Sequence, residues 1–182
     1  MVDTNLKYFT YADFISPDEC DTLADWIIRN QQTDFFAQSI HPGTIRKTTR
    51  FSKDVVYPNI AYVVQNKIDS LVKELFNLDH IRRPPSFPEG MCVSIGTPDD
   101  WCKAHKDPKY LPNHFTYHFN IILSEHENAD LYIENNLVKL SKSDGILYPV
   151  SELEHYTTPL TGNNPRMFWC FAYCIPIKKV LQ

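Results

Sequence analysis

The stretch WCKAHKDP, residues 101–108, is the part of this 182-residue sequence that bears most directly on fold and chemistry. In it, His105 and Asp107 are separated by a single residue. On an extended segment, residues i and i+2 point to the same face, so the imidazole and the carboxylate can converge on one point. Taken alone, the triplet also fits a loop histidine and a turn aspartate before Pro108, so it needs support from the rest of the chain.

That support comes from a second stretch about fifty residues later, HYTTPLTGNNPR at 155–166. It begins with His155 and ends with Arg166, which follows a turn rich in proline, glycine and asparagine. Two histidines and one carboxylate on one face of an ion form the facial triad of non-haem iron(II) sites, which leaves three positions open for a co-substrate and oxygen. His105, Asp107 and His155 therefore form a candidate metal site.

The segments around these motifs read as short strands. Runs rich in β-branched and aromatic residues, separated by turn signals, lie at 91–95, 115–123, 131–133, 146–148 and 167–175. Many short strands at close intervals predict a double-sheet roll or a barrel. Arg166 opens the last run and alternates with Phe168, Cys170 and Ala172, so we expect it to point into the interior.

Helices are expected in the first half of the chain. Ser16, Pro17 and Glu19 form a helix start, with a capping serine, a proline at the first helical position and a glutamate three residues after the cap. A second helix is expected to begin near Pro58, because apolar residues follow it at steps of three and four. Both apolar stripes are expected to pack on the outside of one sheet.

The composition is that of a globular protein, with 43% hydrophobic and 22% charged residues. The net charge of −4 argues against a nucleic-acid or acidic-membrane partner, since both favour a basic surface. No signal peptide or membrane-spanning run is recognisable, so a cytoplasmic location is expected. The five cysteines include no CxxC pair, and we expect buried free thiols rather than a disulfide framework or a structural zinc site.

Taken in order, these motifs resemble the prolyl-4-hydroxylase-like branch of the 2-oxoglutarate/iron(II) dioxygenases. The resemblance covers nearly the whole chain. Its segments are FISPDEC (14–20), RKTTRF (46–51), WCKAHKDP (101–108), FNIILS (119–124), SDGILYP (143–149) and HYTTPLTGNNPR (155–166). One departure concerns the tyrosine that the family often places before the HxD motif to bind the co-substrate. Here Ile95 precedes Gly96, so that contact is absent or is made by another residue.

The resemblance implies a mainly β fold with flanking helices. A double-stranded β-helix (jelly roll) core at about 86–182 would pack against an N-terminal helical support region at about 1–85, all within one domain spanning 1–182.

The resemblance also implies the ligands of the site. Iron(II) would be held by His105, Asp107 and His155, and the distal carboxylate of 2-oxoglutarate by Arg166. A guanidinium suits that role because it grips a carboxylate with two parallel hydrogen bonds. Dioxygen is the further co-substrate, and ascorbate is an optional cofactor.

Other polar residues remain open to two interpretations. His118 and Asn120 share one face of a strand that the alignment turns inward, so they either line the co-substrate pocket or are partly satisfied core residues. His118 is also an alternative to His155 as the third ligand. Arg46, Lys47 and Arg50 form either a substrate-facing loop or a plain solvated basic run.

The implied activity is hydroxylation of an unactivated C–H bond, with release of succinate and carbon dioxide. The family favours a prolyl residue in a protein or peptide as substrate, and a small molecule is the alternative. Two rival functions are a non-oxidative cupin-type metal protein, such as an isomerase or a sensor, and a non-enzymatic binding module that uses the aromatic strands. No nucleic-acid or membrane partner is expected, and no oligomeric state is predicted.

Overall fold

The computed structural model describes residues 6–39, 46–50 and 52–181; Phe51, the last residue of the RKTTRF segment, lies outside these ranges. The chain is mainly β, as expected. In order, its elements are β1 (Phe9–Tyr11), α1 (Pro17–Asn30), β2 (Ala37–Gln38), β3 (Lys47–Thr48), α2 (Asn59–Leu75), the 3₁₀ turn η1 (Pro88–Gly90), β4 (Met91–Gly96), β5 (Cys102–His105), β6 (His114–Ile122), β7 (Glu127–Asn128), β8 (Leu131–Ile133), β9 (Asn136–Val138), β10 (Gly145–Tyr148), β11 (His155–Thr157), β12 (Leu160–Thr161), β13 (Arg166–Pro176) and α3 (Ile177–Val180).

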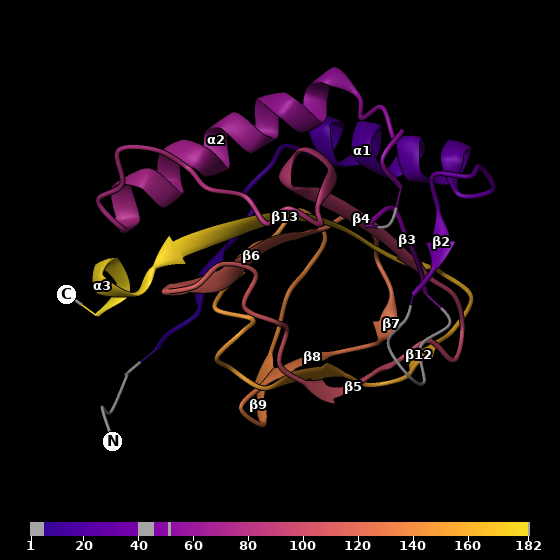
Figure 1. Ribbon diagram of the computed structural model, residues 1–182. Coiled ribbons are helices and arrows are strands. Elements are labelled where there is room, and N and C mark those ends of the chain that lie inside the picture. The colour runs from indigo at the N-terminus through magenta and orange to yellow at the C-terminus, as the bar shows by residue number, and fades with distance from the viewer. Residues whose placement is uncertain (1–5, 40–45, 51, 182) are drawn as a thin grey trace.

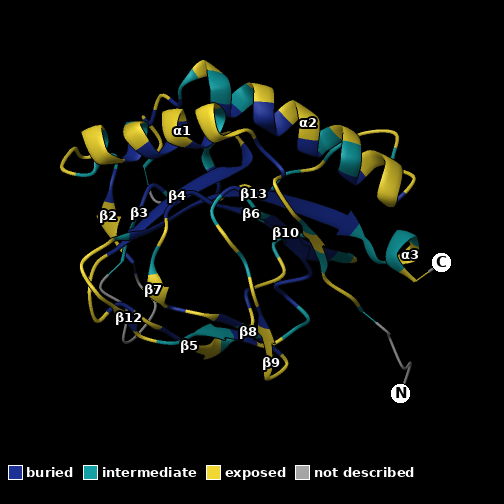
Figure 2. Cartoon of the chain, turned by 180° about the vertical axis from the view of Figure 1, so that it is seen from behind, coloured by how far each residue is buried: buried dark blue, intermediate teal, exposed yellow. Residues whose placement is uncertain are grey.

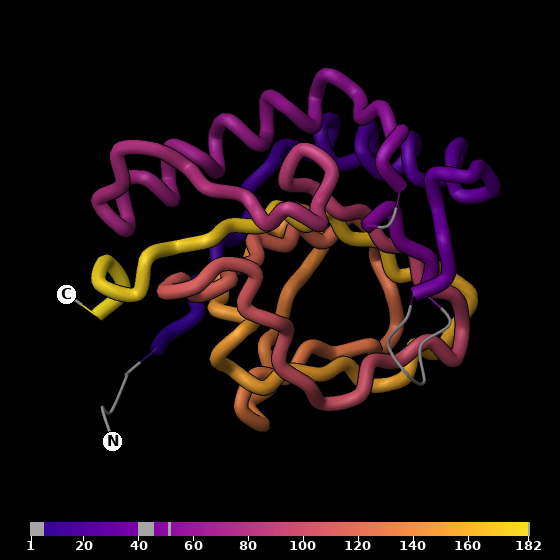
Figure 3. The backbone as a smooth tube through the Cα atoms, in the orientation of Figure 1, coloured from indigo at the N-terminus to yellow at the C-terminus, as the bar shows by residue number. Residues whose placement is uncertain are grey.

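The strands form two facing sheets, and α1 and α2 lie on the outside of the larger one (Figure 1). The larger sheet has seven strands in the order β1-β10-β6-β13-β4-β3-β2, and the smaller has four in the order β5-β11-β8-β9. A pair, β12-β7, lies to one side. Figure 3 shows the resulting layers, with the helices above, the larger sheet in the middle and the smaller sheet below. Within the described residues neither sheet closes on itself. Of the two predicted alternatives, the strands therefore form the double-sheet roll and not the closed barrel.

Both long helices begin where the sequence indicates. Ser16 caps α1: its side chain accepts a hydrogen bond from the amide of Glu19, whose carboxylate accepts one from the amide of Ser16. This capping box satisfies two amides that the helix itself leaves unpaired. The helix α2 starts directly after Pro58. Figure 2 shows that each helix turns a buried stripe toward the sheet and an exposed stripe outward.

The strands β6 and β13 are buried on both faces, and this two-sided burial creates the interior of the roll. Odd-numbered residues of β13, including Trp169 and Phe171, belong to the large apolar cluster shared with the helices. Even-numbered residues, including Phe168 and Cys170, belong to a separate cluster on the opposite face. Because side chains alternate along a strand, the polar residues at even positions of β6 and β13 also face that interior.

Five of the strands match the expected runs, and the other strands of the described residues do not appear in the sequence pattern. Strands β4, β6, β8, β10 and β13 coincide with the predicted segments within two residues at each end. The strands β1, β2 and β3 lie in the region expected to be helical support and extend both edges of the larger sheet. The five cysteines are buried and free, as expected. No helix in the described ranges is long and apolar enough to cross a membrane.

Candidate metal centre

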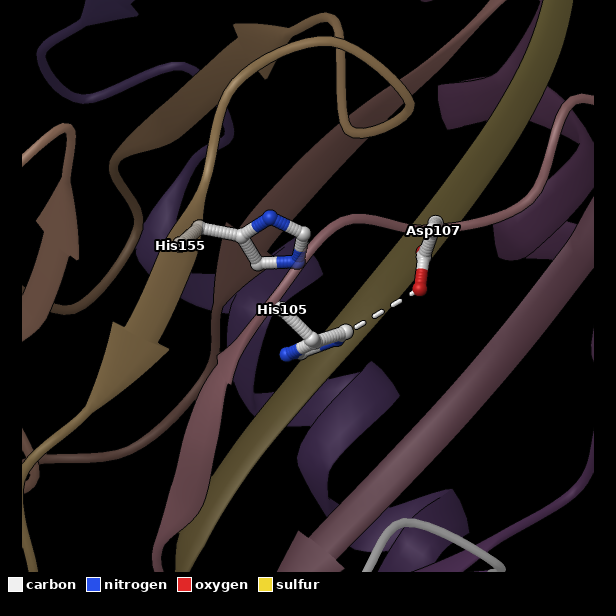
Figure 4. A group of neighbouring side chains, drawn as sticks. All are labelled: His105, Asp107 and His155. Atoms are coloured by element: carbon white, nitrogen blue, oxygen red, sulfur yellow. Dashed lines mark ion pairs between the residues drawn. The ribbon is translucent and has the colours of Figure 1, made fainter.

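Three side chains from two segments far apart in the sequence converge on one point. One ligand atom from each of His105, Asp107 and His155 lies within 4.8 Å of the other two. Figure 4 shows the three side chains turned toward one another, with His155 on β11 and the other two on and just after β5. The Nε2 atom of His105 is 3.4 Å from Oδ1 of Asp107. The structure thus brings together the three residues that the sequence indicated.

Backbone pairing places the two histidines. In the antiparallel pair β5–β11, His105 stands directly opposite His155, and the ring centroids are 4.3 Å apart. Directly opposed residues on one face of a pair of strands hold their Cβ atoms about 5 Å apart, which suits two ligands of one ion. Asp107 follows two residues later on the same face, and its amide donates to the carbonyl of Val150 at 2.8 Å.

Both imidazoles are oriented by hydrogen bonds to backbone carbonyls. The Nδ1 atom of His105 is 2.7 Å from the carbonyl of Lys103, and Nδ1 of His155 is 3.1 Å from that of Leu153. A carbonyl can only accept, so Nδ1–H donates in each ring and the lone pair is on Nε2 when the ring is neutral. A backbone carbonyl on the second ring nitrogen is a common feature of metal-binding histidines.

The charge states also suit a cation. Burial raises the pKa of Asp107, but the hydrogen bond from His105 and the charges of His118 and His155 outweigh it, so the pKa lies well below its ordinary value. Burial lowers the pKa of His155 to about 4, against an opposing effect of Asp107. Burial also lowers the pKa of His105, but the hydrogen bond to Asp107 outweighs this and raises it to about 10. His105 must therefore lose the proton on Nε2 before that atom can bind a cation.

A cavity of about 80 Å³ opens from the three residues into the space between the sheets. One water needs about 10–15 Å³ on this scale, so the cavity has room for several waters or one small molecule. Its lining combines charged and polar residues with apolar side chains. The lining includes Arg46, Arg50, Asn120, Tyr148, Arg166 and His118, together with Phe87, Ile122, Leu131, Leu140, Ile146 and Phe168.

Arg166 lies inside this cavity, at the start of β13. The turn before it is closed by Gly162, whose φ of 77° is accessible to glycine at little cost. The residue is 8% exposed, and its buried Nε atom has no hydrogen-bond partner among the described residues. Burial lowers its pKa to about 10, with a further lowering by Arg46 and an opposing effect of Asp100. A buried guanidinium with an unpartnered nitrogen indicates a site for an anion.

His118 and Asn120 both line the cavity from β6. The Nδ1 atom of His118 is 3.7 Å from Oδ2 of Asp107, on the side of the carboxylate away from His105, whose Nε2 approaches Oδ1. Among the described residues, the compact group of ligand atoms contains His155 and not His118. Asn120 donates to the hydroxyl of Tyr148 at 3.4 Å, while its own Oδ1 is buried and has no partner in the part of the chain that the structure describes.

Tyr148 is a cavity residue that the sequence reasoning missed. It is buried, and its ring lies 5.3 Å from that of His155. The sequence did predict a strand at 146–148 that contains Tyr148. In the structure Tyr148 is opposite His118 in the pairing of β10 with β6. Only that register, which the sequence does not reveal, places it in the cavity.

No family model matches the sequence, and a search of curated proteins finds no match. The structure does have close counterparts. A prolyl-4-hydroxylase from Pseudomonas putida superposes with a TM-score of 0.72 at 12% identity, over 94% of this chain and 93% of that one. The chain has the fold of the prolyl hydroxylases. A prolyl hydroxylase from Trichoplax adhaerens, in complex with a peptide of the hypoxia inducible factor oxygen degradation domain, gives 0.69 at 12% identity, over 97% and 86%.

A third protein with this prolyl hydroxylase fold is HygX from Streptomyces hygroscopicus, solved with nickel and 2-oxoglutarate. It gives a TM-score of 0.69 at 11% identity, over 95% of this chain and 84% of that one. The resemblance drawn from the motifs is therefore confirmed for the fold. At such low identity the likeness carries no residue roles, which depend on the geometry of the site itself.

Proposed function

We propose that the protein is an iron(II)- and 2-oxoglutarate-dependent oxygenase that hydroxylates an unactivated C–H bond. The observation that supports this most strongly is the presence, in one cavity, of a two-histidine, one-carboxylate group and a buried arginine with an unpartnered nitrogen. The two facing sheets would form a double-stranded β-helix (jelly roll) core against the N-terminal helices, and the whole chain would act as one domain.

The three candidate ligands suit iron(II). Two imidazole nitrogens and one carboxylate oxygen form a donor set that non-haem iron(II) prefers. His105 and His155 would bind through Nε2, since their Nδ1 atoms are held by backbone carbonyls. Asp107 would bind as an anion. Bound iron(II), together with 2-oxoglutarate and dioxygen, supplies the oxidising chemistry, with succinate and carbon dioxide as the co-products.

The cavity also suits 2-oxoglutarate, which carries two carboxylates. Arg166 would hold the distal one, because a guanidinium pairs with a carboxylate through two parallel hydrogen bonds. Burial raises the pKa of Tyr148, so its hydroxyl stays protonated, and Asn120 already donates to its oxygen. The hydroxyl hydrogen of Tyr148 would then donate to the bound 2-oxoglutarate. Tyr148 would therefore make the co-substrate contact of the tyrosine that is missing before Gly96. Asn120 and His118 would line the rest of the co-substrate pocket.

The reaction type follows from the ligand set. A carboxylate ligand occupies the position that related halogenases leave open for chloride, so Asp107 favours hydroxylation. Two of the proteins that share the fold are prolyl hydroxylases, one solved with a peptide, and they favour a prolyl residue in a protein or peptide as the substrate. A small molecule is the alternative substrate.

The test is an anaerobic titration of the iron(II)-loaded protein with 2-oxoglutarate, which follows the weak visible charge-transfer band of the chelate. The band is expected at one equivalent, and Arg166→Ala is expected to need far more 2-oxoglutarate while binding iron as before. Arg29→Ala, which removes an exposed arginine paired with Asp25, is the matched control. Iron binding without any band would refute the co-substrate and favour the cupin-type alternative.

A further inference from the structure

A second hollow lies at the far end of β13 from the metal cavity. The strand begins with Arg166, which lines that cavity, and ends with Pro176, which lines an open cleft of about 630 Å³. Its 11 residues make it roughly 35 Å long at about 3.3 Å per residue. The two sites are therefore far apart, and they share no lining residue. A cleft of this volume is within the usual range of small-molecule sites, roughly 300–1,000 Å³.

Backbone hydrogen bonds hold the walls of the cleft in place. The loop after α2 forms one wall, where the amide of Cys174 donates to the carbonyl of Arg82 at 2.9 Å. The start of β6 and the helix α3 form the other, where the amide of Ile177 donates to the carbonyl of Asn113 at 3.1 Å. The last turn of α2 and α3 lie at the same end of the molecule (Figure 1). The cleft is thus formed before any ligand binds, which lowers the cost of binding.

The lining of the cleft is positively charged, although the chain as a whole is not. Arg82, Lys178 and Lys179 line it together with one acidic residue, Asp79. Three positive charges less one negative charge give +2 with histidines neutral, against −4 for the whole chain. In the part of the chain that the structure describes, none of the three cations forms an ion pair with an acidic side chain. Their charge is therefore available to an anion.

The deepest part of the cleft is apolar. Cys174 is 1% exposed, and the half-buried side chains of Leu78, Pro176 and Ile177 lie around it. Burial raises the pKa of the Cys174 thiol to about 11, against an opposing effect of Arg82, so the thiol is neutral and the guanidinium lies close by. Apolar side chains next to a few charged groups suit a ligand that has both an apolar body and a negative group.

Two imidazoles add hydrogen-bonding groups to the same lining. Nδ1 of His114 is 2.7 Å from the carbonyl of Pro112, so Nδ1–H donates there and Nε2 remains for a ligand. Nε of Arg82 donates to Nε2 of His80 at 3.4 Å, which leaves the two terminal nitrogens of the guanidinium. Two terminal nitrogens can donate parallel hydrogen bonds to two oxygens of a phosphate.

We propose that this cleft binds an organic phosphate monoester, with the phosphate between Arg82 and the lysines of α3 and the apolar body against Cys174 and Ile177. A phosphate monoester carries about −1.5 to −2 charges at pH 7, which matches the charge of the lining. The apolar body distinguishes this ligand from inorganic phosphate, which has the charge alone. The site is independent of the oxygenase chemistry proposed above.

The test is a calorimetric titration of the full chain, without added metal, with phenyl phosphate, inorganic phosphate and phenol. We expect phenyl phosphate to bind at least about 10-fold more tightly than phenol, the ratio that one charge-assisted hydrogen bond gives. It is expected to bind about 10-fold more tightly than inorganic phosphate, because its ring leaves water for the apolar part of the cleft. Arg82→Gln and Lys178→Gln are each expected to weaken binding of phenyl phosphate about 10-fold.

Lys139→Gln is the matched control, because Lys139 is exposed and lines neither the cleft nor the metal cavity. Arg166→Ala removes the other anion site and is expected to bind phenyl phosphate as the wild type does. Loss of binding in Arg166→Ala would place the anion in the metal cavity and overturn the proposal. Unchanged binding in both Arg82→Gln and Lys178→Gln overturns it as well, and so does a wild type that binds phenyl phosphate no better than inorganic phosphate, absence of binding included.

Discussion

His105 and His155 face each other across the β5–β11 pair with ring centroids 4.3 Å apart. Two of the three candidate ligands are therefore fixed by hydrogen-bonded backbone, and each ring is further oriented by a carbonyl two residues earlier in the chain. Such an arrangement is formed before any ion binds, so loss of one ligand is expected to change metal affinity more than folding.

His155→Ala is expected to abolish activity and to weaken binding of iron(II) by at least about 100-fold, because one of three protein ligands is lost. Even the loss of a residue that only hydrogen-bonds to a ligand lowers metal affinity about 10- to 100-fold. Anaerobic metal titration measures the change. His114→Ala is the control, since His114 opens β6 outside the cavity. Full activity in His155→Ala would instead assign the third ligand to His118.

His118→Leu is expected to lower metal affinity about 10-fold, because it removes the imidazole 3.7 Å from the outer oxygen of Asp107. His118→Asn keeps a polar group and is expected to restore part of the affinity. Comparing the two variants with the wild type in a manganese(II) titration separates this orienting role from simple packing. Equal affinity of all three proteins would show that His118 does not act on Asp107.

Tyr148→Phe is expected to raise the dissociation constant of 2-oxoglutarate about 2- to 10-fold, the effect of one neutral hydrogen bond, with metal binding unchanged. The anaerobic chelate titration measures it. Tyr132→Phe, on the smaller sheet and stacked on Tyr156, is the control. An unchanged constant would exclude Tyr148 from the co-substrate site.

The metal-free protein is expected to lose stability as the pH falls from about 6.5 to 4. The folded pKa values of His118 and His155 are lowered to about 3 and 4, so both are neutral in the fold while the unfolded chain takes up protons below 6.5. The unfolded state then binds more protons, and stability falls by up to about 1.4 kcal/mol per pH unit for each group.

The titration of His105 has the opposite effect on the stability of the fold. Its pKa is raised to about 10, so its contribution is complete below 6.5 and is lost between 6.5 and 10. Urea unfolding of chelator-treated protein across pH 4–9 should therefore show maximal stability near pH 6.5. In His118→Leu the acid slope should be shallower, and an identical slope would contradict the assignment of that proton uptake.

The sequence predicted those parts of the molecule that local patterns specify. The capping box at Ser16 and the alternation along β13 each depend on residues close in the chain, and both appear in the structure. The convergence of His105, Asp107 and His155 was inferred from the order of motifs, and the pairing of β5 with β11 supplies its physical basis.

Other features depend on contacts between distant strands and could not be read from the sequence. The short strands β2 and β3 have only two residues each, too few for a period to be recognised. Tyr148 and Arg50 enter the cavity through the register of β10 and the path of the chain after β3. The sequence left Arg50 open between a substrate-facing loop and a solvated basic run, and the structure includes it in the lining of the cavity.

The candidate metal ligands belong to the smaller sheet and the segment after it, whereas Arg166, Asn120 and Tyr148 belong to the larger one. A dicarboxylate held at one end by the metal and at the other by Arg166 would tie the two sheets together. Hydrogen–deuterium exchange in β5, β8, β9 and β11 would then slow when 2-oxoglutarate binds, well beyond the residues it contacts, because a ligand that joins two layers suppresses the local opening of the less stable one.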